Sequence, residues 1–299
     1  MIDKLELFLA LARERHFGRT AEACNISQPT LSSAIRQLEE QLGVRLVRRG
    51  SRFQGLTSEG ERTLEWARRI VGNYRTMHAE MRFARKGLSG NATIAVIPTA
   101  LTMVHKLTGG FAATHPDITF TILSRTSGEI REMIANMEAD LGITYLENEP
   151  LGAVVTVPLY HERYRFVTTD CEVAEMPAEI SWSEAATHPL CLLTPDMQNR
   201  RILEGYLSRH LSAAPPLIET DSIVAMISHI VNGNCCGILP EHLAQLFTGT
   251  QGIAGRLCSI QLTDPDGVQL IGAIATKSEP HTPMVAALLR QSRQISLIS

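Results

Sequence analysis

Residues 17–43 constrain the fold of this chain more than any other stretch. A short run of small residues comes first, then a three-residue connection, then an amphipathic segment that begins at Gln28. Ser27 suits the N-cap of this segment, and Pro29 suits its first turn, where a missing backbone N–H costs nothing. The pattern predicts two helices joined by a tight turn.

The second of these helices has two unlike faces. Leu31, Ile35 and Leu38 fall on one face, which predicts that this side is buried. Short polar groups near a helix N-terminus can reach phosphates and base edges in a DNA major groove. The pattern alone also fits an ordinary helical hairpin within a protein core. The polar face carries Gln28, Thr30, Ser32, Ser33 and Arg36.

A basic segment follows the second helix and favours DNA binding. The helix is expected to end at Gly43, and four arginines then fall within eight residues, at positions 45, 48, 49 and 52. A hairpin with this charge forms a wing that can meet phosphates or a minor groove. Thr57 or Ser58 then caps a further helix. Residues 1–58 are therefore predicted to form a winged helix-turn-helix domain.

These residues carry a resemblance to a known family. Residues 5–60 resemble the N-terminal domain of LysR-type transcriptional regulators. Two positions depart from the family pattern: Ser33, where Arg or Gln is common, and Val47, where Phe is usual. The matching positions are Ser27 to Ser32, Ile35 to Glu40, Leu42, Gly43, Arg49, Arg52, Leu56, Thr57 and Gly60.

The resemblance implies a way of recognising DNA. Two heads would bind a palindromic promoter site as a dimer, and a second dimer commonly gives a tetramer in this family. Arg49 and Arg52 would engage the DNA backbone or the minor groove. The residues expected in the major groove are Gln28, Pro29, Thr30, Ser32, Ser33 and Arg36.

The distribution of charge agrees with a single DNA-binding domain. The chain of 299 residues has a net charge of −3, which by itself argues weakly against nucleic acid. Residues 1–90, however, carry 16 Lys and Arg against 10 Asp and Glu, a net charge of +6, and the remainder carries −9. A basic head on an acidic body is expected when only one domain touches DNA.

A long helical pattern covers residues 59–86. Packing on its own domain is one explanation, but that domain is small and the helix would extend roughly 40 Å at about 1.5 Å per residue. We therefore expect dimerisation through this linker helix, followed by a flexible hinge at residues 87–90. An alternating spacing of three and four, typical of a coiled-coil seam, relates Leu64, Ala67, Val71, Tyr74, His78 and Met81.

Residues 91–299 alternate short apolar strands with helical segments. This alternation predicts an α/β domain with a mostly parallel sheet and helices on both faces. The segment resembles the periplasmic-binding-protein-like effector domain of the LysR family. The resemblance implies two subdomains, with residues 91–161 and 265–299 in the first and residues 162–264 in the second.

Loops after the predicted strands are the expected ligand site. In open α/β folds, ligands lie beyond the carboxyl ends of strands, beside helix N-termini, and such termini favour small anions. The loops at 98–100, 125–128 and 220–222 fit this description, and the family resemblance adds residues 194–199. Thr99, Ser127 and Asp221 could equally serve as N-caps. The candidate effector-binding residues are Thr99, Ala100, Thr126, Ser127, Gln198 and Asp221.

Other chemistry finds little support in the sequence. The six cysteines lack CxxC spacing, so buried reduced thiols are expected, with a redox-active pair as the alternative. The histidines are scattered, so neither a metal nor a cofactor is predicted. No run approaches the ~20 apolar residues that cross a membrane, and residues 5–12 lack the flanks of a signal peptide. A cytoplasmic protein without a membrane partner is expected.

The rival hypothesis is a cytoplasmic small-molecule-binding protein or an enzyme built on the α/β body. The sequence shows no nucleophile–base pair at recognisable spacing, no G-x-G-x-x-G and no P-loop, so an enzyme is not expected. The N-terminal domain is also similar to those of LysR-type regulators associated with formate dehydrogenase operons. That similarity suggests formate or another small carboxylate as the effector.

Overall fold

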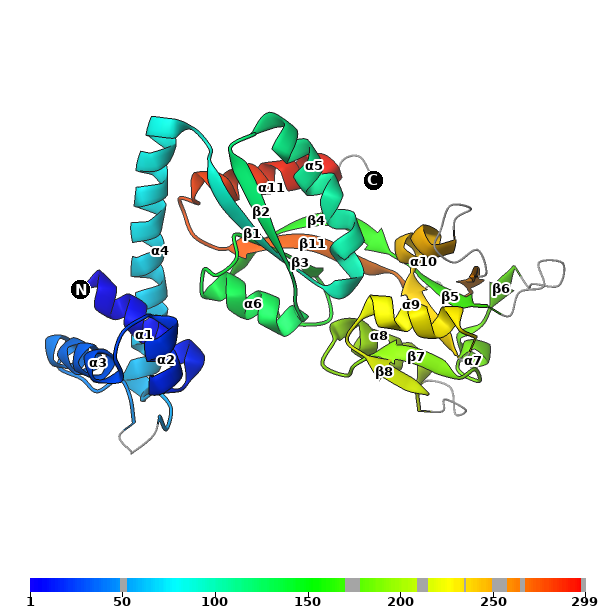
Figure 1. The fold of residues 1–299 in the computed structure, drawn as a ribbon, viewed down its shortest axis with the longest axis horizontal. Coiled ribbons are helices and arrows are strands. Elements are labelled where there is room, and N and C mark those ends of the chain that lie inside the picture. Colours follow the sequence, from blue (N-terminus) through cyan, green and yellow to red (C-terminus); the bar gives the residue numbers. More distant parts are fainter. Residues whose placement is uncertain are drawn as a thin grey trace. The chain divides into compact units, whose positions relative to one another are not determined.

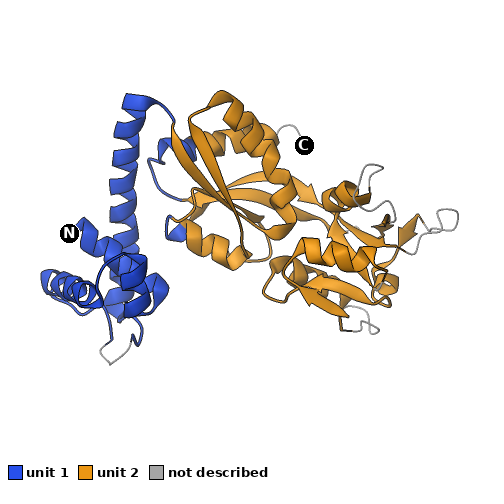
Figure 2. Cartoon of the chain, viewed as in Figure 1, with its two compact units in different colours: residues 1–88, 135–137, 277–286 blue, residues 89–134, 138–276, 287–299 orange. Residues whose placement is uncertain are grey.

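The computed structural model describes residues 1–48, 53–169, 178–208, 215–233, 235–248, 257–263 and 267–296. The chain divides into two compact units (Figure 2). The first unit comprises residues 1–88, 135–137 and 277–286, and the second comprises residues 89–134, 138–276 and 287–299.

The first unit contains a helix-turn-helix, a wing and one long helix (Figure 1). Phe8, Leu31, Leu38 and Leu46 form its fully buried core, which joins all of these elements. The predicted winged helix-turn-helix with a long helix is confirmed. The helices are α1 (Ile2–Glu14), α2 (Phe17–Ala23), α3 (Gln28–Leu42) and α4 (Ser58–Lys86).

Local capping chemistry sets the ends of α3 and α4. The Ser27 side chain accepts a hydrogen bond from the Thr30 N–H at 3.2 Å, as an N-cap should. Gly43 ends α3 in the left-handed conformation, with φ of 69°, which a glycine adopts without steric cost. Thr57, not Ser58, caps α4 and accepts from the Gly60 N–H at 2.9 Å.

The second unit contains two sheets, and the first of them forms subdomain I. Its strand order is β2-β1-β3-β11-β4. β1 pairs in parallel with β2 and β3, whereas β11 runs antiparallel to β3 and β4. The strands are β1 (Gly90–Val96), β2 (Ile118–Ser124), β3 (Leu141–Tyr145), β4 (Val154–Glu162) and β11 (Gln269–Thr276).

The second sheet forms subdomain II, with the order β6-β10-β5-β9-β7-β8. β7 is parallel to β8 and β9, and β5 is antiparallel to β9 and β10. The strands are β5 (Tyr164–Thr168), β6 (Glu179–Ile180), β7 (Leu190–Leu193), β8 (Ile218–Thr220), β9 (Cys236–Pro240) and β10 (Cys258–Leu262).

The two sheets are mostly parallel, as predicted, because only β11 in the first sheet and β5 in the second run against the direction of the other strands. The chain passes from β4 of the first sheet directly into β5 of the second through Arg163. It returns when β10 of the second sheet is followed by β11 of the first. The strands that follow these passages, β5 and β11, run antiparallel to their neighbours.

Helices cover both faces of each sheet. In β3, neighbouring side chains point to opposite faces: a Cβ at Gly142 would lie 2.5 Å from Ile130 of α6, while Ile143 faces α5 and α11. In subdomain II, α7 and α8 cover one face and α9 and α10 the other. The helices are η1 (Pro98–Met103), α5 (Val104–Thr114), α6 (Ser127–Ala135), α7 (Trp182–Ala185), α8 (Gln198–Leu207), α9 (Ile223–Val231), α10 (Glu241–Thr248) and α11 (Pro283–Ser296).

Candidate functional site

The outer face of α3 is open to solvent, whereas its inner face packs in the core. The first turn of α3 contains no acidic residue, so the partial positive charge of the helix N-terminus is not neutralised within the helix. Such a terminus favours a phosphate group. Among the predicted DNA-binding residues, Ser32 is half-buried, and those that are exposed are Gln28, Pro29, Thr30, Ser33 and Arg36.

The wing is held to α3 by one half-buried carboxylate. Glu39 Oε1 accepts hydrogen bonds from the N–H groups of Leu46 at 2.7 Å and Val47 at 3.2 Å. Val47 pairs with Leu56 in an antiparallel bridge, and the Arg48 N–H donates to the Gly55 carbonyl oxygen. The predicted DNA contacts at positions 49 and 52, Arg49 and Arg52, lie outside the described residues.

The exposed apolar face of α4 differs from the predicted seam. Leu64, Ala67 and Val71 are buried in the core of the first unit, so for them packing on their own domain is the correct explanation. That domain is large enough to cover the N-terminal half of the helix. A separate apolar stripe stays exposed along α4 and consists of Trp66, Ile70, Tyr74, Met77 and Met81. We call this set the α4 stripe.

Three predicted effector residues lie at the carboxyl ends of strands in subdomain I. Thr99 and Ala100 follow β1 within η1 and are almost fully buried. Ser127 follows β2 as the first residue of α6 and is only 1% exposed. The topology therefore places them along one edge of the sheet, as expected from parallel pairing of β1 and β2.

Capping of α6 is performed by Thr126, not by Ser127. Thr126 Oγ1 accepts from the Glu129 N–H at 3.2 Å, and Glu129 Oε2 accepts from the Thr126 N–H at 2.8 Å. This reciprocal arrangement is a capping box. The Ser127 hydroxyl is buried and has no hydrogen-bond partner among the described residues. Thr126 thus has a structural role.

The other candidate caps also differ from expectation. Ser222, not Asp221, caps α9 and accepts from the Ala225 N–H at 3.3 Å, while Asp221 is exposed. Thr99 caps no helix, because the N-cap of η1 is Ile97. Its hydroxyl instead faces another side chain.

That side chain is Tyr145, the centre of a buried polar network at the contact between the subdomains. Its hydroxyl lies 3.3 Å from Thr99 Oγ1 and donates to Glu162 Oε1 at 2.8 Å. Asn199 Nδ2, from α8 of subdomain II, donates to the Tyr145 hydroxyl at 3.2 Å and to that of Tyr164 at 3.4 Å. The network therefore joins the edge of the first sheet to the N-terminus of α8.

Glu162 is the ionisable group of this network. Its side chain is 1% exposed, and burial raises its pKa to about 7, against the lowering effect of the Tyr145 hydrogen bond. The carboxyl group therefore changes protonation state near neutral pH. It does so at the last residue of β4, just before the chain passes into subdomain II.

Two further contacts join α8 to the loop after β3. Gln198 Nε2 donates to the Glu147 carbonyl oxygen at 3.1 Å, and Gln198 Oε1 is buried with no partner in the part of the chain that the structure describes. Glu149 forms ion pairs with Arg131 of subdomain I and Arg201 of subdomain II. Burial alone would raise the pKa of Glu149, but the hydrogen bonds from the two arginines outweigh burial and lower it.

A histidine from α10 completes the contact. His242 Nε2 lies 2.9 Å from the Thr99 carbonyl oxygen, and because a carbonyl only accepts, this nitrogen carries the proton. Burial lowers the pKa of His242, and the charge of Lys106 acts in the same direction. We use the term junction for the contacts that Thr99, Tyr145, Glu147, Glu149 and Glu162 make with Tyr164, Gln198, Asn199, Arg201 and His242.

Sequence reasoning missed several residues of the junction. Tyr145 ends a buried strand, so the rule that selected Thr99 and Ser127 could have found it. Glu162 is a single carboxylate at the end of an apolar strand. A lone carboxylate of this kind does not indicate a site residue when the fold is unknown. His242 has no local signal, because α10 reaches Thr99 only through the tertiary fold.

The expectation that all cysteines are reduced is not met. Cys24, Cys191, Cys235 and Cys236 are free thiols, and burial raises the pKa of Cys191 to about 12. Cys258 is disulfide-bonded, which contradicts the expectation for this residue. The sixth cysteine, at position 171, lies outside the described residues.

Across the described residues, no three His, Cys, Asp or Glu side chains lie together as a metal site would require. In the same part of the chain, no helix has the length and apolar character needed to span a membrane.

Comparison with known families identifies the two parts of the chain. Residues 85–295 match the family model of the LysR substrate binding domain, and residues 2–61 match that of the bacterial regulatory helix-turn-helix protein, lysR family.

The chain belongs to the LysR family. This LysR-type transcriptional regulator is 27% identical to the HTH-type transcriptional activator IlvY of Salmonella typhimurium, over 95% of this chain and 96% of the relative. It is 30% identical to the HTH-type transcriptional regulator XapR of Escherichia coli, over 62% of this chain and 61% of the relative.

Solved structures share the fold of this LysR-type regulator. A full-length OxyR from Pseudomonas aeruginosa aligns with a TM-score of 0.74 and 22% identity, over 98% of this chain and 94% of that one. Full-length CbnR bound to its target DNA aligns with a TM-score of 0.58 and 19% identity, over 99% of both chains. The predicted combination of a DNA-binding head with a two-sheet α/β body is thereby confirmed.

Proposed function

We propose that this LysR-type regulator binds a palindromic promoter site through the exposed face of α3 and the wing. The observation that carries the proposal is the N-terminal half of α3, which presents short polar side chains and Arg36 without an acidic residue in its first turn. Such a surface accepts phosphates and reads base edges. A regulator that acts on chromosomal DNA works in the cytoplasm.

The protein is proposed to act as a homodimer through the α4 stripe, with two dimers forming a tetramer. Five large apolar side chains at helical spacing are exposed in the stripe. A solvent-exposed stripe of this kind is expected to be covered by a second copy of the same helix.

A small anionic effector is proposed to bind at the junction, and formate is the first candidate. Gln198 Oε1, at the junction, and Ser127 Oγ, on the same edge of the subdomain I sheet as Thr99, are buried without hydrogen-bond partners among the described residues. Burying a polar atom without a hydrogen-bond partner destabilises the folded protein, and a ligand that supplies the missing hydrogen bond therefore binds more tightly. The N-terminus of α8 has no side-chain cap, so its N–H groups favour an anion. The protonated form of Glu162 could donate to a carboxylate.

DNA binding is tested by fluorescence anisotropy with the DNA upstream of the regulator's own gene, over a salt series. We expect specific binding that weakens steeply with salt, and Arg36→Ala should reduce the salt slope by about one. Arg290→Ala, an exposed arginine on α11, is the matched control and should bind like the parent protein. Equal affinity for this DNA, for neighbouring intergenic DNA and for random DNA would contradict the proposal.

Effector binding is tested by isothermal titration calorimetry with sodium formate and sodium acetate, and with ethylamine as the probe of opposite charge. We expect a carboxylate to bind, and Ser127→Ala and Gln198→Ala to weaken it. Glu132→Gln, at an exposed position of α6, should leave it unchanged. Binding of the amine in place of both carboxylates would refute an anionic effector.

A further inference from the structure

Glu162 lies where the chain passes between the two subdomains. It is the last residue of β4, and Arg163 leads from it directly into β5 of subdomain II. Its side chain is buried, and Oε1 accepts the hydrogen bond from the Tyr145 hydroxyl. Oε2 is buried and has no hydrogen-bond partner among the described residues. A movement of one subdomain against the other therefore changes the contact of this carboxyl group with water.

The groups that surround Glu162 inside the junction are neutral. Tyr145 of β3 and Tyr164 of β5 lower its pKa through hydrogen bonds, but burial outweighs them and raises it. Burial also raises the pKa values of these two phenols and of Tyr160 on β4, so all three keep their protons. The elements α8 and β11 add two neutral amides to these surroundings, those of Asn199 and Gln269.

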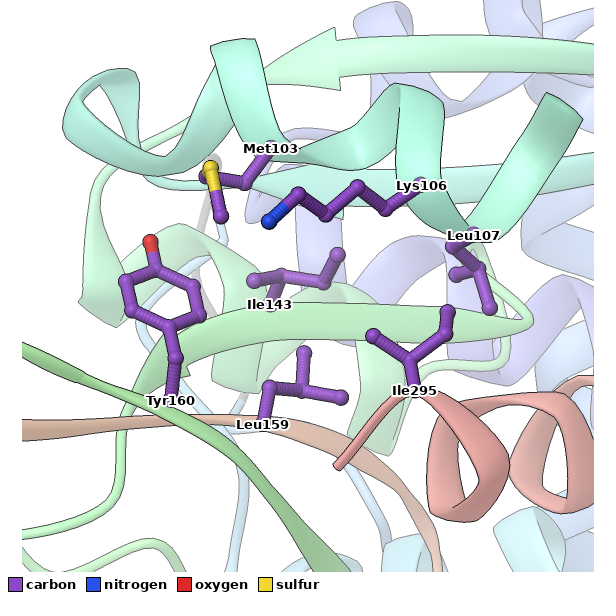
Figure 3. A pocket seen from close by; sticks show the side chains of 7 residues that line it. All are labelled: Met103, Lys106, Leu107, Ile143, Leu159, Tyr160 and Ile295. Atoms are coloured by element: carbon purple, nitrogen blue, oxygen red, sulfur yellow. The ribbon is translucent and has the colours of Figure 1, made fainter. Parts of the chain in front are cut away.

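A cation and a histidine lie further out, beyond Tyr160. Tyr160 is placed among apolar side chains of subdomain I (Figure 3), and its ring packs edge-on against His242 of α10, with centroids 5.6 Å apart. Burial lowers the pKa of His242, and the charge of Lys106, which is exposed, acts in the same direction. His242 therefore takes up its proton at a lower pH than Glu162 does.

A negative charge on Glu162 is consequently costly while the junction contacts are formed. Among the described residues, hydrogen bonds alone stabilise that charge, because no charged side chain acts on the carboxyl group. We call the arrangement with these contacts closed, and an arrangement in which they are broken and water reaches Glu162 open. Water stabilises a carboxylate that a buried site destabilises, so the closed arrangement binds the proton more tightly than the open one.

We propose that the junction is a switch operated by one proton: uptake of the proton by Glu162 favours the closed arrangement, and its release favours the open one. The direction follows from linkage, since the arrangement with the higher proton affinity gains population as pH falls. The pKa of Glu162 is about 7 when buried, against an ordinary value of 4.5 in water. The ratio of closed to open molecules should therefore fall about tenfold from pH 6 to pH 8.

The experiment measures the distance between the subdomains by double electron–electron resonance on the full-length protein. Nitroxides are attached to Ala113→Cys on α5 and Gln245→Cys on α10, two exposed positions. The half-buried Cys24 is replaced by serine, and the same protein without the two introduced cysteines must take up no nitroxide. Labelled protein is diluted with unlabelled protein, so that only distances within one chain are recorded. We expect two distance populations, whose ratio changes about tenfold between pH 6 and pH 8.

Three variants assign the change to Glu162. Glu162→Gln cannot release a proton and should show one ratio at every pH, whereas exposed Glu132→Gln should follow the parent. Tyr145→Phe removes a hydrogen bond that lowers the pKa of Glu162, so the closed population should begin to rise at a higher pH. A purely structural role of Tyr145 would change the ratio equally at all pH values. A constant ratio in the parent, or the same pH dependence in Glu162→Gln, would overturn the switch.

The effect on DNA rests on the proposed function, and its test separates the two proposals. Fluorescence anisotropy at pH 6 and pH 8 should show that the specific DNA affinity of the parent changes with pH relative to that of Glu162→Gln. Equal pH dependence of DNA affinity in both proteins would overturn control of DNA binding by the switch. Absence of specific DNA binding at any pH, with the change in distance intact, would refute the proposed function and still support the switch.

Discussion

Glu162→Gln is the most informative perturbation of the junction. The carboxyl group is buried and accepts a hydrogen bond from Tyr145 at 2.8 Å. A glutamine keeps the accepting oxygen and nearly the same shape, but it cannot gain or lose a proton. The variant therefore isolates the effect of the protonation equilibrium from the effect of packing.

The size of the expected change in the free energy of unfolding follows from the pKa of Glu162. Burial raises it from an ordinary value of 4.5 to about 7. Between these values the folded protein keeps the proton that the unfolded chain releases, so the free energy of unfolding falls as pH rises through this window. The difference between the two pKa values corresponds to a loss of on the order of 3 kcal/mol in the free energy of unfolding by pH 8, since one pKa unit is about 1.4 kcal/mol.

The assay is thermal unfolding of the parent protein and of Glu162→Gln from pH 4.5 to pH 8, at one protein concentration. The parent should lose roughly 10 °C of melting temperature relative to the variant across this range, at about 2–4 °C per kcal/mol for the α/β body. Other titrating groups are common to both proteins and cancel in the difference. Exposed Glu132→Gln is the matched control and should follow the parent.

One result would refute the reasoning about Glu162. If the parent and the variant show the same dependence of melting temperature on pH, the carboxyl group does not titrate within the window. The burial of Glu162 would then be relieved by another arrangement of the junction, and the buried network around Tyr145 would not describe the protein in solution.

Three further perturbations test other parts of the chain. Gly60→Ala places a Cβ 2.1 Å from the Leu46 carbonyl oxygen, so we expect roughly 2 kcal/mol or more of destabilisation in urea unfolding and weaker DNA binding; unchanged stability would contradict the close approach of wing and α4. Thr126→Ala removes one half of the capping box and should cost about 1 kcal/mol, which Thr126→Ser should largely restore. Ile70→Glu on the α4 stripe should shift sedimentation towards smaller assemblies than that of the parent protein without loss of helical circular dichroism, and a parent-like assembly would exclude the stripe as an interface.

The sequence was most informative where structure is decided locally. The limits of α4 follow from Thr57 at its start and the glycine at position 87 at its end, and these signals lie within one turn of the residues they affect. The two faces of α3 follow from helical spacing in the same way. The pattern failed on the α4 seam, because burial of Leu64 in its own domain and burial against a partner helix require the same spacing.

The junction could be predicted only in part. Residues on the edge of the subdomain I sheet could be predicted, because Thr99 and Ser127 follow strands whose carboxyl ends meet in any parallel pair. Their partners in the junction could not be predicted, since Glu162 reaches Tyr145 only when β11 pairs between β3 and β4. Asn199 reaches it only when α8 of subdomain II approaches that edge. Such contacts depend on strand order across the sheet, which no short stretch of sequence encodes.

The strength of the junction sets what an effector must achieve. The bonds from Gln198 to the Glu147 carbonyl, from His242 to the Thr99 carbonyl and from Asn199 to the Tyr145 hydroxyl contribute about 1 kcal/mol each. The partly exposed pair of Arg201 with Glu149 adds about 0–1 kcal/mol. A ligand that replaces these contacts must therefore bind one arrangement of the subdomains roughly several hundredfold more tightly than the other. A molecule that binds both arrangements equally changes nothing, however tight its binding. Effector candidates should consequently be ranked by how far they shift DNA affinity, because affinity for the protein alone does not identify the signal.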